Sequence, residues 1–285
     1  MNLTDYADIR RLLERHGFRF SKSMGQNFLI DASVPRRIAE ASGADETCGV
    51  VEIGPGIGCL TEQLASRAGK VVSVELDRSL APVLQETLEG LENIELVFGD
   101  VMKQDLRALA EEKLPGLTKP VCANLPYNIT SPVLTAVVKA GCFERVCVMV
   151  QKEVAERICA GPGTRDYGAF GLFMQWYYEP ELLFTVPPHC FVPQPKVTSA
   201  VVLLRRRETP LCEVADEELF FRVIRAAFNQ RRKTLPNALT AVFPDLSKEE
   251  TETILQKCSL HPKIRGEMLT LSEFAEISNE ISARK

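Results

Sequence analysis

The sequence has no uninterrupted apolar run long enough to cross a bilayer, so we expect no membrane-spanning segment. Its opening residues, MNLTDYADIRRLLERHG, lack the apolar region of a signal peptide, and their acidic residues are unlike the acid-poor composition of a transit peptide. At 285 residues, 45% hydrophobic and 25% charged, the chain has room for one large or two smaller soluble domains. We expect a cytoplasmic monomer with no membrane partner.

The spacings of a metal site are also missing. Nine cysteines are scattered along the chain without a CxxC pair, and the three histidines are far apart. Most of the cysteines have apolar neighbours, as Cys147 does in ERVCVMV, where a free thiol packs as a small hydrophobic group. The sequence therefore predicts no metal site and indicates a reducing compartment.

An overall excess of positive charge is lacking too, because the net charge is −4. The distribution is uneven: residues 10–22 hold five basic residues against one acidic residue, and residues 196–233 hold nine against five. Two basic zones on an otherwise acidic chain are typical of a local phosphate-binding face. Solvated helix surfaces are an equally good interpretation of either zone.

Short strand-like runs alternate with helical stretches between residues 48 and 205. Several runs are apolar almost throughout, as strands covered on both faces are. Alternation of this kind predicts an α/β doubly wound parallel sheet. The runs are GVVEIG, VVSVEL, IELVFGD, VCAN, VCVMVQ, LLFTV and AVVLLRR.

The rest of the chain has a different character. Residues 1–45 read as a helical and loop lead-in to a catalytic domain over 1–207, and residues 208–285 read as a smaller all-helical domain. The turn-rich stretch AGPGTRDYGAFG, at 160–171, is expected to be a mobile surface loop.

A glycine-rich turn follows the first strand of the sheet. In VVEIGPGIGCLT the glycines Gly54, Gly56 and Gly58 allow a tight turn and close approach of the backbone to a ligand. The spacing is GxGxG rather than the dinucleotide GxGxxG. Taken alone, such a turn is a weak signal of a ligand site, and simple structural punctuation is the less favoured alternative.

Acidic residues at the ends of successive strands narrow the choice of ligand. Glu75 ends the second strand, where a carboxylate accepts from ribose hydroxyls, and Asp100 follows the third, within reach of an adenine amino group. Glu52, inside the motif, opposes a pyrophosphate and favours a cation. The series therefore favours S-adenosylmethionine (AdoMet), a sulfonium, over NAD, although any one acid alone reads as a solvated strand end.

The segment CANLPY ends the fourth strand at the same edge of the sheet. An adenine amino group is a poor nucleophile, and two acceptors on its N–H groups favour a pyramidal nitrogen. The Asn124 side-chain oxygen and the Leu125 carbonyl are the candidate acceptors, because Pro126 holds Leu125 extended. Tyr127 is the candidate for stacking on the base.

These motifs resemble the ribosomal RNA adenine dimethyltransferase family, in particular its small-subunit (16S) branch. The resemblance extends over nearly the whole chain and rests on KSMGQNFLID, VEIGPGIGCLT, VELD, GDV, NLPYNITSP, FVPQPKVTSAVV and FNQRRKTL. It implies a Rossmann-like methyltransferase sheet of seven strands, mostly parallel with the last antiparallel. It further implies AdoMet-dependent dimethylation of two adjacent adenosines near the 3′ end of small-subunit rRNA, within an immature 30S particle.

The resemblance also implies roles for individual residues. The residues that match the family's cofactor contacts are Asn27 and Leu29, with Gln26 nearby, and Gly54, Glu75, Asp100 and Asn124. Phe191 matches a residue that sandwiches the flipped base opposite Tyr127. The RNA-backbone candidates are Lys196, Arg207, Arg231, Arg232 and Lys233, with the first zone as another. Phe191 alone reads as core, Gln26 as a loop residue and Lys196 as a loop cap. Pro236 stands where the family has a polar or basic residue, so the sequence leaves open whether the surface beside it contacts RNA phosphate.

Three alternatives remain at this point. A relative acting on large-subunit rRNA and conferring antibiotic resistance is the nearest, although NLPYNITSP and the long helical tail favour the small-subunit branch. A non-catalytic RNA-binding assembly factor is the second, opposed by the intact acidic and NLPY residues. A nicotinamide oxidoreductase is the third, opposed by GxGxG and Glu52.

Overall fold

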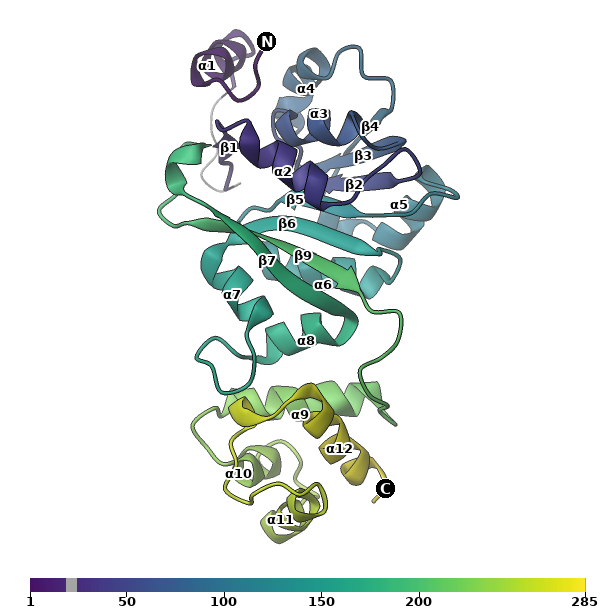
Figure 1. Ribbon diagram of the computed structural model, residues 1–285, viewed down its shortest axis with the longest axis vertical. Helices are drawn as coiled ribbons and strands as arrows, with labels where there is room; N and C mark the ends of the chain where they lie inside the picture. The colour runs from purple at the N-terminus through teal and green to yellow at the C-terminus, as the bar shows by residue number, and fades with distance from the viewer. Residues whose placement is uncertain (19–24, 285) are drawn as a thin grey trace. The chain divides into compact units, whose positions relative to one another are not determined.

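The computed structural model describes residues 1–18 and 25–284, which form two compact units (Figure 1). Unit 1 comprises Met1–Ala155 and Pro180–Arg206, and unit 2 comprises Glu156–Glu179 and Arg207–Lys285. The chain passes from unit 1 to unit 2 for the last time between Arg206 and Arg207. The expected extent of the catalytic domain, 1–207, differs from unit 1, because 156–179 packs with the C-terminal helices.

The sheet of unit 1 has seven strands in the order β4-β3-β2-β5-β6-β9-β7. Strands β4, β3, β2, β5 and β6 are parallel to their neighbours, whereas β9 runs antiparallel to β6. The predicted Rossmann-like sheet with an antiparallel last strand is confirmed. The strands are β2 (Gly49–Ile53), β3 (Lys70–Glu75), β4 (Ile94–Phe98), β5 (Val121–Asn124), β6 (Arg145–Gln151), β7 (Tyr178–Val186) and β9 (Ser199–Arg206).

Helices cover the sheet because its strands are apolar on both faces. Alternate strand residues Val50, Val71, Cys122 and Cys147 join one apolar cluster with the buried sides of helices α1 to α4. The bounds are α1 (Tyr6–Arg15), α2 (Ser33–Ala41), α3 (Cys59–Ala65), η2 (Arg78–Leu80), α4 (Ala81–Thr87), η3 (Val101–Lys103), α5 (Leu106–Lys113), α6 (Thr130–Ala140), α7 (Lys152–Cys159) and η4 (Pro188–Cys190).

The topology of the sheet determines where a ligand can bind. The chain leaves β2 for β3 and β4 on one side and then crosses back to β5 on the other side. Ligands of open α/β sheets bind beyond the carboxyl ends of the strands at such a switch point. The segments that follow β2, β3 and β5 are therefore brought together.

A two-stranded ribbon that the sequence did not predict lies outside the main sheet. Strand β1 (Phe28–Leu29) pairs antiparallel with β8 (Phe191–Val192), with Leu29 opposite Phe191. The Ile30 amide extends the pairing by donating to the Cys190 carbonyl at 2.8 Å. The ribbon joins the GQNFL and FVPQP motifs, 162 residues apart in numbering between Leu29 and Phe191.

Unit 2 is helical and has its own apolar core. Asp216 caps α9 by accepting from the Leu219 amide, and capping boxes start α11 at Ser247 and α12 at Thr270. The buried sides of these helices meet in one cluster with Trp176 of α8. The elements are α8 (Ala169–Tyr177), α9 (Glu217–Asn229), α10 (Leu235–Thr240), α11 (Lys248–Lys257), η5 (Gly266–Met268) and α12 (Leu271–Ser282).

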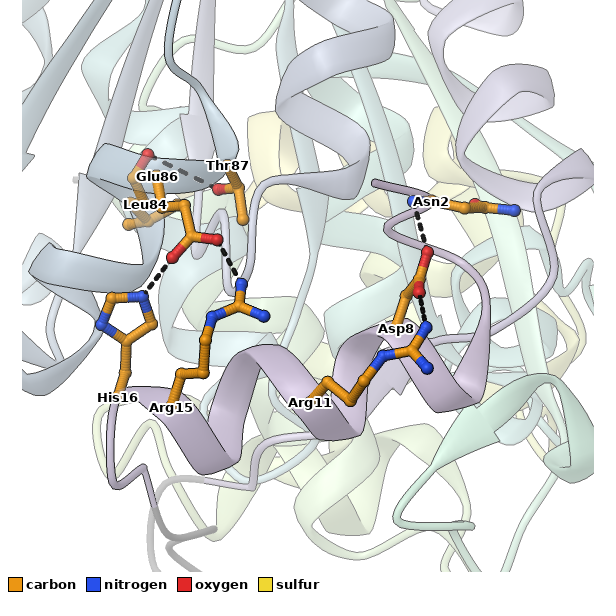
Figure 2. A network of polar contacts seen from close by, with 8 residues as sticks. All are labelled: Asn2, Asp8, Arg11, Arg15, His16, Leu84, Glu86 and Thr87. Atoms are coloured by element: carbon orange, nitrogen blue, oxygen red, sulfur yellow. Dashed lines mark hydrogen bonds and ion pairs between the residues drawn. The ribbon is translucent and has the colours of Figure 1, made fainter.

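Figure 2 shows how the first basic zone is used in the described part of the chain. Arg11 is paired with Asp8, while Arg15 and His16 contact the two carboxylate oxygens of Glu86 on α4, with His16 Nε2 at 2.6 Å. Arg10 is paired with Glu14 at 2.7 Å. These contacts anchor α1 and support the interpretation as a solvated, ion-paired helix; Arg19 and Lys22 lie outside the described residues.

Candidate functional site

A cavity of about 280 Å³ lies beyond the carboxyl ends of β2, β3 and β5. The cofactor and acceptor segments predicted separately from the sequence both contribute to its lining. The predicted residues that line it are Gln26, Asn27, Leu29, Gly54, Gly56, Glu75, Asp100, Asn124, Leu125, Pro126 and Tyr127. Glu52 and Phe191 are not among the lining residues.

The glycine turn after β2 leaves open space at the cavity. Gly54 has a φ of +73°, which is strained for other residues, and a Cβ placed on it would meet no atom of the described residues within 4 Å, its two chain neighbours aside. Gly58 is required by packing, since a Cβ there would lie 2.8 Å from a methyl carbon of Leu88. Gly54 therefore gives a ligand access to the backbone, whereas Gly58 lets α3 approach α4.

Glu75 connects the end of β3 to the glycine turn. One carboxylate oxygen accepts from the Gly56 amide at 3.3 Å and the other accepts from the Asp77 amide at 2.7 Å. The side chain is buried, and burial raises the pKa of the Glu75 carboxyl above its usual value. The carboxylate is held in one orientation at the cavity wall, as a group that binds ribose hydroxyls requires.

Asp100 occupies the corresponding position after β4. Its Oδ1 accepts from the Met102 amide at 2.9 Å and caps η3, which fixes the side chain at the cavity. Glu75 and Asp100 thus project from neighbouring strand ends into one cavity.

The acceptor segment leaves two oxygens free to accept hydrogen bonds. Asn124 donates from Nδ2 to the Asn27 carbonyl at 3.2 Å, which fixes the orientation of its amide. Leu125 continues the sheet through its amide, which donates to the Met149 carbonyl at 3.1 Å. Within residues 1–18 and 25–284, neither the Asn124 Oδ1 nor the Leu125 carbonyl receives a hydrogen bond. Both residues line the cavity, so these oxygens are candidates to accept from a bound amino group.

Tyr127 lines the cavity beside them and is anchored at its hydroxyl. The hydroxyl lies 2.6 Å from Ser199 Oγ at the start of β9, and Ser199 is completely buried. Burial raises the pKa of the Tyr127 phenol above its usual value, so the ring is neutral at physiological pH. The sequence analysis missed Ser199, although it lies in the recognised KVTSAVV motif.

Glu52 does not line the cavity, which corrects the prediction that its charge faces a bound cation. It shares a face of the sheet with Val50, where its Oε2 accepts from Thr61 Oγ1 at 2.7 Å and from Ser73 Oγ at 2.6 Å. Residues two apart in a strand point to the same side, so Glu52 lies on the side of β2 that Val50 buries in the apolar cluster. The carboxyl is fully buried, and burial raises its pKa to about 7.

Replacing Glu52 by glutamine is expected to alter how stability depends on pH. The pKa of Glu52 rises from the usual 4.5 to about 7 on folding, so the folded state binds the proton more tightly. Its stabilising contribution is complete below pH 4.5 and is lost, by about 3 kcal/mol, as pH rises through 7. Relative to the wild type, Glu52→Gln should therefore gain stability between pH 5 and pH 8 in urea unfolding.

Glu95→Gln is the control for that experiment. The pKa of Glu95 is lowered by Lys113 and Lys70, so its contribution is present at high pH and lost as pH falls. Between pH 5 and pH 8 that variant should be less stable than the wild type by a nearly constant amount, because the contribution of Glu95 changes only around and below its usual pKa of 4.5. Parallel stability curves for Glu52→Gln and the wild type would show that Glu52 ionises normally.

Phe191 is also placed differently from its predicted role. It is 3% exposed, pairs with Leu29 in the β1–β8 ribbon and belongs to the apolar cluster of unit 1. The structure therefore does not bring the ring to the cavity opposite Tyr127. Its position supports the core interpretation, in which Phe191 holds the segment that carries Asn27.

The predicted RNA-binding residues fall into two groups. Arg207 donates to the Gln175 carbonyl at 2.9 Å, and Arg231 donates to Glu267 at 2.6 Å and to the Thr164 and Arg165 carbonyls at 2.9 and 2.6 Å. Both guanidinium groups are therefore used inside unit 2. The exposed group comprises Lys196, Arg232 and Lys233.

The Arg231 contacts reach into the segment 160–171, for which a mobile surface loop stays a prediction. Two carbonyls of this segment accept from Arg231, and the Gly163 amide donates to the Glu267 carbonyl at 2.8 Å. Tyr167 is buried and donates from its hydroxyl to the Leu269 carbonyl at 2.6 Å. The segment is therefore anchored within unit 2.

Pro236 is buried in the first turn of α10, where proline is favourable.

Within residues 1–18 and 25–284, no cluster of three or more His, Cys, Asp or Glu side chains is arranged to hold a metal ion. None of the helices there combines the length and apolarity that crossing a membrane requires. The nine cysteines all lie in this part of the chain, and none of them forms a disulfide.

The sheet order, the glycine turn and the acidic strand ends around one cavity define a Rossmann-like methyltransferase. Comparison with known proteins makes the assignment narrower. The model of the family described as ribosomal RNA adenine dimethylase matches residues 17–277, so the chain belongs to this family.

Two bacterial relatives match over nearly the full length. Proteins named ribosomal RNA small subunit methyltransferase A are 47% identical in Geobacillus thermodenitrificans, covering 95% of this chain and 94% of the relative, and 45% identical in Streptococcus gordonii, covering 99% of each. The crystal structure of the 23S rRNA methyltransferase ErmE matches with a TM-score of 0.70 and 28% identity, over 90% of this chain and 99% of that one. A dimethyladenosine transferase from Plasmodium falciparum shares the fold, with a TM-score of 0.75, 24% identity and 87% and 95% coverage.

Proposed function

We propose that this protein transfers methyl groups from AdoMet to the exocyclic amino groups of two adjacent adenosines near the 3′ end of small-subunit (16S) rRNA, giving dimethyladenosines. The observation that carries this proposal is the single cavity in which the acidic strand ends meet the NLPY segment. Relatives named for the small subunit, at 45–47% identity, support the choice of RNA. The substrate is proposed to be an immature 30S particle in the cytoplasm, and the enzyme is proposed to act as a monomer.

The cavity fits AdoMet better than a dinucleotide. Its lining, among the described residues, includes Glu75 and Asp100 but no lysine or arginine. A pyrophosphate would meet negative charge without a basic partner, whereas a sulfonium is attracted. The open space at Gly54 accommodates a ligand against the backbone. Glu52 lies outside the lining and takes no part in this attraction.

Residues of the chain would hold AdoMet at both ends. Glu75 is placed to accept from the ribose hydroxyls and Asp100 from the adenine amino group, while the loop of Asn27 and Leu29 borders the same cavity. When bound, AdoMet supplies an electrophilic methyl group. The chain's own contribution is to align the acceptor with it, because a correctly oriented pair reacts far faster than separate molecules.

The acceptor end of the cavity is suited to an aromatic amine. The Asn124 Oδ1 and the Leu125 carbonyl accept from the two N–H groups and draw the nitrogen away from planarity, so its lone pair becomes available. Tyr127 offers a neutral ring for stacking, held through Ser199. No strong base is required, because the nitrogen becomes acidic once it is methylated. An adenosine must leave its stack to enter, which costs least in a loop of the RNA.

RNA binding is expected to depend on the exposed cations of unit 2. Replacing Arg232 and Lys233 together by alanine should weaken binding to undermethylated small-subunit RNA and lower the slope of log affinity against log salt by roughly 1 to 2. Arg231→Ala is the contrast. Because Arg231 is held by Glu267 and two carbonyls, its loss should lower the melting temperature while leaving the salt slope unchanged. A slope flattened as much by Arg231→Ala as by the double variant would contradict this division.

The similarity to ErmE keeps a large-subunit substrate as the second candidate. Undermethylated small and large subunits, each incubated separately with the protein and AdoMet, distinguish the two. Mass analysis of the RNA is expected to find two adjacent dimethyladenosines in the small-subunit RNA alone. Methylation of the large-subunit RNA would favour the alternative, and cofactor binding without transfer to either would favour a non-catalytic assembly factor.

A further inference from the structure

The loop Gly25–Leu29 is tied to the sheet on two sides of the cavity. On the β3 side, Gln26 donates from Nε2 to Asp77 Oδ2 at 2.7 Å. On the β5 side, the Asn27 carbonyl accepts from Asn124 Nδ2 at 3.2 Å. Of the four residues that form these two hydrogen bonds, Gln26, Asn27 and Asn124 line the cavity, whereas Asp77 does not. Asp77 therefore acts on the cavity only through its neighbours.

Asp77 is itself held so that one oxygen faces the loop. Its Oδ1 accepts from the Ser79 amide at 3.0 Å and from Ser79 Oγ at 2.6 Å, which caps η2. Its amide donates to the Glu75 carboxylate at 2.7 Å. Only Oδ2 of the carboxylate is directed to Gln26. The chain of contacts thus runs from the proposed ribose-binding carboxylate, through Asp77, to the loop.

The second tie determines which end of the Asn124 amide is available. With Nδ2 bound to the Asn27 carbonyl, Oδ1 is left to accept. A reversed amide would present N–H groups to an incoming amino group, and two donors do not pair. The position of the Asn27 carbonyl, and so of the whole loop, therefore decides whether Asn124 can act as an acceptor.

We propose that Asp77 is a positioning residue that latches the loop Gly25–Leu29 through Gln26, and that this latch couples retention of AdoMet to the orientation of Asn124. The role of the latch in retaining AdoMet rests on AdoMet binding alone. Its coupling to Asn124 rests on the proposed methyl transfer. The bond from Gln26 to Asp77 holds the loop on the side of the methyl donor, and this fixes the position of the Asn27 carbonyl beside Asn124 on the side of the methyl acceptor. An enzyme with the latch broken would lose AdoMet faster and also align the amine less well.

A charge swap tests the latch. Gln26→Glu places a second carboxylate against Asp77, which repels the loop, and AdoMet should dissociate at least ten times faster from the full-length protein in stopped flow. Asp77→Asn should change the rate less than threefold. Its oxygen stays with Ser79, so its nitrogen faces the side-chain amide of Gln26, and no two like charges are brought together.

The double variant Gln26→Glu/Asp77→Asn should restore the dissociation rate to within threefold of the wild type, because the new side-chain amide of Asp77→Asn then donates to the new carboxylate of Gln26→Glu. Gln85→Glu, which adds the same charge at an exposed position on α4, is the matched control and should leave the rate unchanged. Melting temperatures of all four variants separate a loosened loop from a damaged fold. A merely structural role for Asp77 predicts no rescue.

Single-turnover methylation of undermethylated small-subunit RNA at saturating AdoMet tests the coupling. Gln26→Glu should remain slower than the wild type even when the cofactor site is filled, and the double variant should recover. The latch would be overturned if AdoMet dissociated from Gln26→Glu at the wild-type rate. It would also be overturned if AdoMet dissociated from the double variant as fast as from Gln26→Glu. Failure of the wild type itself to transfer methyl groups would instead overturn the proposed function, and the dissociation rates would still decide the latch.

Discussion

Asn124→Ala is expected to lower the single-turnover rate of methyl transfer by about 100-fold or more, the typical cost of deleting one preorganised polar group at a reacting centre. The substitution removes the oxygen that we propose accepts from the adenine amine. It also removes the Nδ2 donor to the Asn27 carbonyl, so the loop loses its tie on the acceptor side. The rate is measured with undermethylated small-subunit RNA at saturating AdoMet.

Asn124→Asp is the matched variant for that experiment. It retains an acceptor oxygen but places a second oxygen against the Asn27 carbonyl, so an intermediate rate is expected. Asn124 lies at the carboxyl end of β5, and its side chain contributes nothing to the core, so both variants should unfold near the wild-type temperature. Near-normal turnover of Asn124→Ala would refute the assignment of the acceptor site.

Glu75→Ala is expected to weaken AdoMet binding by about 100-fold in isothermal titration. A hydrogen bond to a charged group contributes about 1.5–3 kcal/mol, and loss of the two proposed ribose contacts costs about 3 kcal/mol or more. The carboxylate also holds the Gly56 amide, so the glycine turn becomes less well ordered. Glu75→Gln, which retains one acceptor, should cost about tenfold.

The control for Glu75 is Glu95 on the neighbouring strand. Its carboxylate is paired with Lys70 at 2.9 Å and Lys113 at 2.8 Å and does not line the cavity. Glu95→Ala should therefore bind AdoMet as the wild type does. Equal affinities for Glu75→Ala and the wild type would place the cofactor elsewhere.

Sequence patterns predicted the scaffold well because the relevant signals are local. The apolar runs of a covered sheet, the glycines of the turn and the acids at or just beyond the strand ends can all be recognised within a few residues. The carboxyl ends of parallel strands share an edge, so residues from three separate motifs could be assigned to one site. Glu75, Asp100, Asn124 and Tyr127 do line one cavity.

The errors arose where a side chain's direction or partner decides its role. Every residue of β2 is buried, so alternation alone could not show that Glu52 points toward α3 with Val50, and the proximity of the glycine turn led to the wrong interpretation. Arg231 was read from its motif as a phosphate contact, and its partner Glu267 is 36 residues away, where no local pattern announces it. The β1–β8 ribbon has only two residues in each strand, too few for a periodic signal, and it accounts for the buried position of Phe191.

The crystal structure of the full-length protein with AdoMet tests the central claim most directly. The claim is that the donor and acceptor meet at the carboxyl ends of β2, β3 and β5. We predict the adenosine between Glu75 and Asp100, the methionine part beneath the loop Gly25–Leu29, and the methyl group directed toward Asn124. AdoMet bound away from the glycine turn, or with its methyl group facing away from Asn124, would contradict the account.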